Sequence, residues 1–302
     1  MSVMPNLTLG PTVRKDLHLH DKKLKALEER ANAIREDVID MLVEAGSGHS
    51  AGPLGMADIF TALYFHVMSH DPKRPNWDDR DRLILSNGHI CPILYATLTH
   101  AGYFSKTQMM TLRKLGSPLQ GHPERTRLPG IENTAGPLGD GSSQAVGLAY
   151  AALLDRKPWR VYCVMSDGEL ECGITWEAML FAGRNRLYNC TFIIDRNNIQ
   201  IDGNTEDIMP LEPLAQKFES FGLNVIRCAG NSIRDFVTAV ERAHGVSEKP
   251  SVIIADTIPG YGVTFMEHDF EWHGKSPSPG EESMRAIEQI RTLGGRIKSE
   301  HE

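Results

Sequence analysis

The 302-residue chain lacks the features that mark several broad classes of protein. No apolar run reaches the length of a transmembrane helix, and the first 21 residues contain no apolar core of the signal-peptide type. Lys and Arg (32) are outnumbered by Asp and Glu (39), so the net charge of −7 gives no general attraction to nucleic acid or to an anionic membrane. Internal repeats and low-complexity tracts are also absent. We therefore expect no nucleic-acid partner and no membrane partner.

Cysteine is scarce as well. The five cysteines are odd in number and form no CxxC pair, which favours reduced, mostly buried thiols in a cytoplasmic protein. What is present is ordinary globular composition, with 41% hydrophobic and 24% charged residues. The length allows one large domain or two ordinary ones.

Apolar, β-prone runs alternate with helical segments along most of the chain. The runs at 160–165 and 190–194 are continuous and stop at polar or glycine turns, as buried parallel strands do, and a helix over 174–187 is expected between them. We therefore predict an α/β fold, a parallel sheet flanked by helices. Further strands are expected at 83–85, 223–227 and 251–255, and further helices at 21–45, 56–68, 90–101, 142–154, 213–219, 233–244 and 281–293.

The ends of the chain are expected to differ from its middle. Residues 1–20 are interpreted as a loosely ordered arm, 21–275 as the main domain and 276–302 as a helical tail. Asp21 and Asn231 are the expected N-caps of the helices that follow them, and Gly46 is the expected C-terminal glycine of the first helix.

Oxygen donors follow both of the central strands. Asp167 lies in the turn after the first strand, and Asn197 follows the second, 30 positions later. Because ligands of doubly wound sheets bind beyond the carboxyl ends of the strands, we expect these two side chains to meet there. One carboxylate and one amide oxygen, with no soft donor, suit Mg²⁺ or Ca²⁺.

Three further loops combine glycine with one functional side chain or with an alanine-rich helix. The first spans 47–55 around His49, whose ring is expected to be exposed, and the second spans 86–89 and ends in His89 at a helix start, a natural anion pocket. The third spans 132–141 and permits close backbone approach, against which a flat ring could lie. Each loop alone can also be explained as a turn or cap between elements.

Taken in order, these segments resemble the N-terminal portion of the transketolase family. The segment from Asp167-Gly168 to Asn197-Asn198 is similar to the thiamine diphosphate signature, although Ser166 stands where that signature usually has glycine. The other matching pieces are ANAIR at 31–35, SGHSAGPLGMADI at 47–59, DRDRLILSNGH at 79–89, GHPE at 121–124, GPLGDG at 136–141, IDG at 201–203 and WHGK at 272–275. The resemblance covers about residues 25–290 and implies the fold that binds the diphosphate of this cofactor.

The resemblance also implies roles for individual residues. The implied thiamine diphosphate contacts are His89, Gly136, Pro137, Leu138, Gly168, Asn197 and His273. The implied ligands of Mg²⁺ (or Ca²⁺) are Asp167, Asn197 and the main-chain oxygen of Ile199. The residues implied to line the sugar channel and to assist proton transfer are His49, His122 and His273. Cys172 replaces a glutamate that links the paired active sites of the family, and Glu171 or Glu169 is the candidate substitute.

The family's pyrimidine-binding half has no counterpart in this chain, because too few residues follow 275. The resemblance therefore implies the N-terminal subunit of a split transketolase: a dimer of this chain joined by two C-terminal subunits that carry the pyrimidine-binding domain. It would transfer a two-carbon ketol unit between sugar phosphates, of the pentose phosphate type or of an unusual branched or sulfonated kind. The alternatives are another thiamine diphosphate enzyme, such as deoxyxylulose phosphate synthase or dihydroxyacetone synthase, and a non-catalytic binding or regulatory subunit with this fold.

Overall fold

The computed structural model describes residues 16–301, and the five expected apolar runs all form strands in it. They are β1 (Arg82–Leu85), β2 (Val161–Ser166), β3 (Cys190–Arg196), β6 (Asn224–Ala229) and β7 (Ser251–Asp256). They form one sheet in the order β1-β2-β3-β7-β6, and every neighbouring pair is parallel. The predicted α/β architecture is confirmed.

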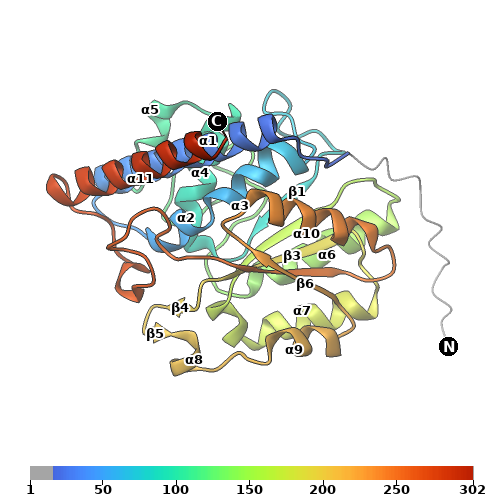
Figure 1. Cartoon of the computed structure of the whole chain (residues 1–302). Helices are drawn as coiled ribbons and strands as arrows, with labels where there is room; N and C mark the ends of the chain where they lie inside the picture. The colour runs from blue at the N-terminus through green and yellow to red at the C-terminus, as the bar shows by residue number, and fades with distance from the viewer. Residues whose placement is uncertain (1–15, 302) are drawn as a thin grey trace, which may run out of the picture.

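Alternate side chains of each strand point to opposite faces of the sheet and pack into two separate hydrophobic clusters. Tyr162 and Val164 pack into the larger cluster beneath α1, α3 and α10, whereas Cys163 and Met165 pack into the cluster beneath α6, α7 and α9. Figure 1 shows helices on both faces of the sheet. Strands covered on both faces have to be apolar throughout, which explains their continuous hydrophobic sequence.

The longer helices follow the predicted segments closely. The helices are α1 (Asp21–Ala45), α2 (Ala51–Gly55), α3 (Ala57–Ala62), α4 (Cys91–Ala101), α5 (Lys106–Met109), α6 (Asp140–Leu154), α7 (Gly173–Arg184), α8 (Thr205–Ile208), α9 (Leu214–Ser220), α10 (Ile233–Gly245) and α11 (Glu281–Glu300). Short 3₁₀ or π turns occupy Leu63–Val67, Gly88–Ile90, Gly168–Glu171 and Phe270–Trp272, and a small hairpin pairs β4 (Ile199–Gln200) with β5 (Gly203–Asn204). The sequence did not predict the short helices α2, α5 and α8, of which α2 lies within the expected loop 47–55.

Two of the three predicted caps need correction. Gly46 ends α1 in the left-handed conformation (φ 67°), as expected, and its N–H donates to the carbonyl oxygen of Leu42 at 2.9 Å. Asp21, however, is the first helical residue and His20 occupies the cap. Asn231 does not cap α10 either, because its side chain donates to Gly55 O and accepts from Ile258 N. The cap is Ser232, whose hydroxyl accepts from the main chain of α10.

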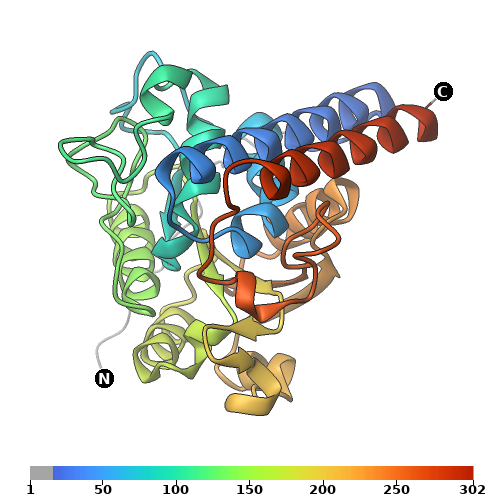
Figure 2. The same cartoon turned by 90° about the vertical axis from the view of Figure 1, so that its left-hand side faces the viewer.

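The last helix continues to Glu300, seven residues beyond the predicted end, because it packs lengthwise on α1 (Figures 1 and 2). Ala286 and Ile290 are buried there, and the amide of Asn32 donates to the carbonyl oxygen of Ile290 at 2.9 Å. Of the predicted arm, residues 1–15 lie outside the described residues, whereas Leu17 and Leu19 are buried.

Close packing on the face of the sheet that α6, α7 and α9 cover depends on Gly183 of α7. A Cβ atom built on Gly183 would lie 1.9 Å from the carbonyl oxygen of Phe221, in the turn between α9 and β6. That distance leaves no room for any side chain. Within residues 16–301, all five cysteines are free thiols and no helix is both long and apolar enough to cross a membrane.

Candidate functional site

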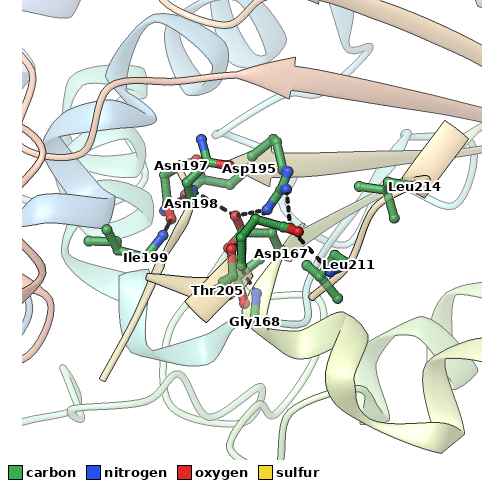
Figure 3. A network of polar contacts seen from close by, with 12 residues as sticks. Asp167, Gly168, Asp195, Asn197, Asn198, Ile199, Thr205, Leu211 and Leu214 are labelled. Atoms are coloured by element: carbon green, nitrogen blue, oxygen red, sulfur yellow. Dashed lines mark hydrogen bonds and ion pairs between the residues drawn. The ribbon is translucent and has the colours of Figure 1, made fainter. Parts of the chain in front are cut away.

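Asp167 and Asn197 lie at the same edge of the sheet, because β2 and β3 end side by side, with Ser166 opposite Asp195 (Figure 3). The Asp167 carboxylate is fully buried. Its Oδ1 accepts from the main-chain N–H of Gly168 at 2.8 Å, and its Oδ2 accepts from the N–H of Asn198 at 2.7 Å. Backbone donors therefore fix the carboxylate in the turn where the sequence placed it.

The side chain of Asn197 is held with its oxygen in a defined direction. Its Nδ2 donates to Asp195 Oδ2 at 2.9 Å, so Oδ1 must be the oxygen that accepts from Ile199 N at 3.0 Å. Asp195 is itself buried, and its other oxygen accepts from the hydroxyl of Thr257 on the neighbouring loop. The position of Asn197 is thus set by two neighbouring strands.

The oxygen lone pairs that Asp167 and Asn197 leave unused suit a hard cation. A carboxylate has about four lone-pair positions and an amide oxygen has two. Three of those on Asp167 and one on Asn197 are engaged, which leaves one on each. Among the described residues there is no cluster of three or more His, Cys, Asp or Glu side chains that could hold a metal. A cation here would therefore depend on mixed oxygen donors, including the carbonyl of Ile199, and on ligand phosphates and water.

Burial controls the protonation of the acids at this edge. It raises the pKa of Asp167 to about 6, although the Arg196 guanidinium and two backbone donors oppose the shift. Burial also raises the pKa of Asp195 to about 7 and that of Glu169 to about 7. A cation bound among them would favour the ionised carboxylates.

Arg196 is the functional side chain that the sequence did not single out here. It is the last residue of β3, only 2% exposed, and its Nη1 donates to Asp167 Oδ2 at 3.0 Å and to the hydroxyl of Thr205 at 2.9 Å. Its Nη2 donates to Glu206 at 2.6 Å and to Glu212 at 3.3 Å. Arg196 therefore ties the predicted metal carboxylate to the segment that contains α8.

Four histidines predicted from separate loops gather beside one another. The ring centroids of His49, His89 and His273 lie 5.0–5.7 Å apart. A Cβ atom built on Gly88 would lie 3.1 Å from Cδ2 of His122, which places the fourth ring next to the same loop. His49 is only partly exposed, contrary to expectation, and its Nδ1 is buried with no hydrogen-bond partner.

These rings are neutral at pH 7. Burial lowers the pKa of His49 to about 4, and the nearby His273 ring and Arg113 guanidinium add to the shift. Burial also lowers the pKa values of His89, His122 and His273. A neutral imidazole donates at one nitrogen and accepts at the other, so the cluster can exchange hydrogen bonds with hydroxyl groups and relay protons.

The glycine-rich loop before α6 has open space beside it. A Cβ atom built on Gly136 would meet no atom within 4 Å, and the side chain of Leu138 is 39% exposed. Nearby, both amide atoms of the fully buried Asn87 lack partners. An open apolar loop beside unpartnered polar atoms fits a flat, polar ligand such as the expected cofactor.

Glu169, in the turn after Asp167, joins these loops. Its carboxylate is 0% exposed and accepts from the hydroxyl of Ser86, from Gly139 N at 2.6 Å and from Ser166 N at 3.2 Å. With both oxygens engaged inside the chain, Glu169 is not free to link paired sites. Glu171 stays the candidate for that role, and its Oε1 is buried without a partner.

Comparison with known proteins places this site in a known family. The family described as "Transketolase, thiamine diphosphate binding domain" matches residues 27–294. A 6-deoxy-6-sulfo-D-fructose transketolase subunit of Clostridium sp. (strain MSTE9) is 42% identical, over 82% of this chain and 90% of that protein. An apulose-4-phosphate transketolase subunit of Actinobacillus succinogenes is 39% identical, over 88% and 96%.

Longer relatives match through part of their length only. Human transketolase is 36% identical over 89% of this chain but 42% of its own. The crystal structure of transketolase from Campylobacter jejuni superposes with a TM-score of 0.82 at 36% identity, covering 90% of this chain and 45% of that one.

Proposed function

The chain belongs to the transketolase family, and from that premise we propose that it is the N-terminal subunit of a two-subunit, thiamine diphosphate-dependent transketolase. Together with a C-terminal subunit, it would transfer a two-carbon ketol unit from a ketose phosphate, or from an unusual branched or sulfonated ketose, to an aldose phosphate. The observation that carries this proposal is the convergence of the oxygen donors, the histidine cluster and the open glycine loop at one edge of the sheet.

The cofactor would lie across this edge. Gly136, Pro137 and Leu138 would face its rings, while Gly168 and His89 would approach the diphosphate. Asp167, Asn197 and the Ile199 carbonyl would hold Mg²⁺ or Ca²⁺, which screens the charge of the diphosphate. Bound thiamine diphosphate supplies the carbanion chemistry that cleaves and forms a carbon–carbon bond beside a carbonyl group.

The chain's own contribution to the reaction lies in the histidines. His49, His122 and His273 would line the sugar channel and hydrogen-bond substrate hydroxyls, and His273 would also contact the cofactor. Because burial keeps the rings neutral, each can accept a proton from one hydroxyl and return it to another without first losing a charge.

The lengths of the relatives support a two-subunit enzyme. The chain covers 90% and 96% of two proteins named transketolase subunits, but only 42% of human transketolase. The remaining half of the single-chain enzymes would then be supplied by the partner, with its pyrimidine-binding domain, in an α2β2 assembly.

The substrate is the open part of the proposal. The two subunit-type relatives are named for 6-deoxy-6-sulfo-D-fructose and for apulose-4-phosphate. We favour an unusual sugar of the sulfonated or branched kind over the pentose phosphates, because the members matched along nearly their whole length carry these names.

The test is reconstitution. The purified chain alone should show no measurable ketol transfer, whereas mixing it with a pyrimidine-domain chain encoded beside it should produce turnover that requires thiamine diphosphate and Mg²⁺. The assay would compare 6-deoxy-6-sulfo-D-fructose, apulose-4-phosphate and fructose-6-phosphate as donors. Ordinary turnover by the chain alone would contradict the two-subunit proposal. Tight cofactor binding by the mixture without turnover of any donor would favour the non-catalytic alternative. Ser166 and Cys172, which depart from the family's usual residues, support that alternative.

Arg196 provides a test of the cation site. Arg196→Lys keeps the positive charge but loses the guanidinium fork, whose Nη1 reaches Asp167 and Thr205 while its Nη2 reaches Glu206. We expect the Kd for Mg²⁺, measured by calorimetry with thiamine diphosphate present, to rise about tenfold, the usual effect of losing a group that orients a metal ligand. Arg227→Lys, which alters an exposed pair with Asp256 on neighbouring strands, is the matched control and should leave the Kd unchanged. An unchanged Kd in both variants would show that Arg196 does not orient the ligand.

A further inference from the structure

Three loops of the proposed cofactor site come from distant parts of the chain, and one buried carboxylate touches all three. The loop 86–89 follows β1, the segment 136–141 runs into the first residues of α6, and the turn 166–168 begins at the last residue of β2. Glu169 is the only side chain among the described residues to which hydrogen bonds from Ser86, Gly139 and Ser166 all run. It has no exposed surface, so these are its contacts rather than water.

The segments that surround Glu169 are closely packed and leave little freedom in their backbone positions. Gly139 adopts a left-handed conformation (φ 86°), which turns its N–H toward the carboxylate. A Cβ atom on Gly141 would lie 2.5 Å from Cα of Ser86, so the start of α6 and the loop after β1 are in direct backbone contact. The hydroxyl of Thr175 on α7 donates to the carbonyl oxygen of Glu169 at 3.1 Å and holds its backbone as well.

We propose that Glu169 is a positioning residue that sets the three loops at the spacing the cofactor requires. Through Gly139 it fixes Gly136–Leu138, which would face the rings, and through Ser86 it fixes the loop that carries His89. Through its own turn it fixes Asp167 and Gly168 relative to both. Glu169 does not touch the cofactor, so its effect passes through these loops, and the inference rests on the proposed function for the identity of the ligand.

A carboxylate suits this task better than a neutral group. All three contacts are donors, and an ionised carboxylate is an acceptor at both oxygens. In Glu169→Gln, one of the two carboxamide atoms becomes an NH₂ group, which would face a donor: either the pair formed by Ser86 and Gly139, or Ser166 N. One contact would turn repulsive and the loops on that side would separate, although the side chain keeps its size.

The first measurement needs no cofactor. Hydrogen exchange of the full chain is compared between wild type and Glu169→Gln, with Glu241→Gln as control, since it makes the same change on the exposed face of α10. We expect faster exchange in peptides covering 84–90 and 133–141 of Glu169→Gln only. Unchanged exchange in both peptides overturns the proposal.

The second measurement is the Kd for thiamine diphosphate at saturating Mg²⁺, by calorimetry, in the complex with the C-terminal subunit. We expect it to rise about tenfold or more in Glu169→Gln, as for other groups that orient a binding site, and to stay constant in Glu241→Gln. If exchange in the two peptides becomes faster but the Kd for thiamine diphosphate does not change, Glu169 only stabilises the loops, and its positioning role is overturned. A wild-type complex that binds no thiamine diphosphate refutes the proposed function instead, and the exchange result still reports whether Glu169 holds the loops.

Ser86→Ala covers the case in which Glu169→Gln does not fold. It removes one donor and leaves the carboxylate in place. We expect it to loosen 84–90 without loosening 133–141 and to weaken cofactor binding by a smaller factor. If both variants fold, their effects on the Kd should be less than multiplicative, because they break one shared contact. Fully multiplicative effects, or a Ser86→Ala variant with wild-type exchange at 84–90, would count against the proposal.

Discussion

Asp167→Ala should strongly weaken cation-dependent cofactor binding. The carboxylate is the only ionised ligand in the proposed set, and losing an orienting neighbour of a metal ligand already weakens affinity about 10- to 100-fold. Loss of the ligand itself is expected to raise the Kd for Mg²⁺ by roughly 100-fold or more on the same scale. Calorimetric titration of the reconstituted complex with Mg²⁺ and thiamine diphosphate measures this directly.

The control for Asp167 is a nearby acid outside the network. Asp202 lies exposed in the turn of the β4–β5 hairpin, so Asp202→Asn removes a similar charge from the same region without removing a ligand. It should bind both Mg²⁺ and cofactor as the wild type does. Wild-type cofactor affinity in Asp167→Ala would remove Asp167 from the metal site and take the main support from the proposed function.

Gly183→Ala should have the largest effect on stability. The new methyl group would lie 1.9 Å from the carbonyl oxygen of Phe221, which is backbone and cannot rotate away. Overpacking typically costs about 1–3 kcal/mol, and the upper part of that range is expected because α7 must move from the turn that precedes β6. The gain in helix propensity of up to about 1 kcal/mol offsets only part of this loss. Urea denaturation of the purified chain measures the difference.

A second helical glycine, Gly295, serves as a control that measures the effect of helix propensity without any packing clash. Gly295 lies exposed within α11, and a Cβ atom there would meet nothing within 4 Å. Gly295→Ala should therefore stabilise the chain, by up to about 1 kcal/mol. If Gly183→Ala were also neutral or stabilising, the close contact between α7 and Phe221 would be wrong.

The sequence predicted the sheet well because its signal is local. Each strand is a short, continuous apolar run, and the rule that parallel strands end at one edge is enough to bring Asp167 and Asn197 together. β3 was predicted two residues too short, because Asp195 and Arg196 are charged. In the structure they still pair with Ala255 and Asp256 of β7, and buried partners compensate their polarity.

What the sequence could not show are contacts between distant segments. Arg196 looks like one charged residue in a polar turn, and its partners Thr205, Glu206 and Glu212 reveal its role only after folding. Glu169 is hidden in the same way, since Ser86 lies 83 positions before it. Asn231 and Ser232 are both good cap residues. The choice between them was decided by Ile258 N, which takes the Asn231 side chain.

The histidine cluster has a consequence for how the protein is made. Its rings come from positions 49, 89 and 273, and the hydroxyl of Ser50 donates to the carbonyl oxygen of Lys275 at 2.6 Å. Residue 275 therefore has to leave the ribosome before this cluster can close. Until then a nascent chain can form its central strands, but it lacks the His273 ring that lies 5.0 Å from His89 and 5.7 Å from His49.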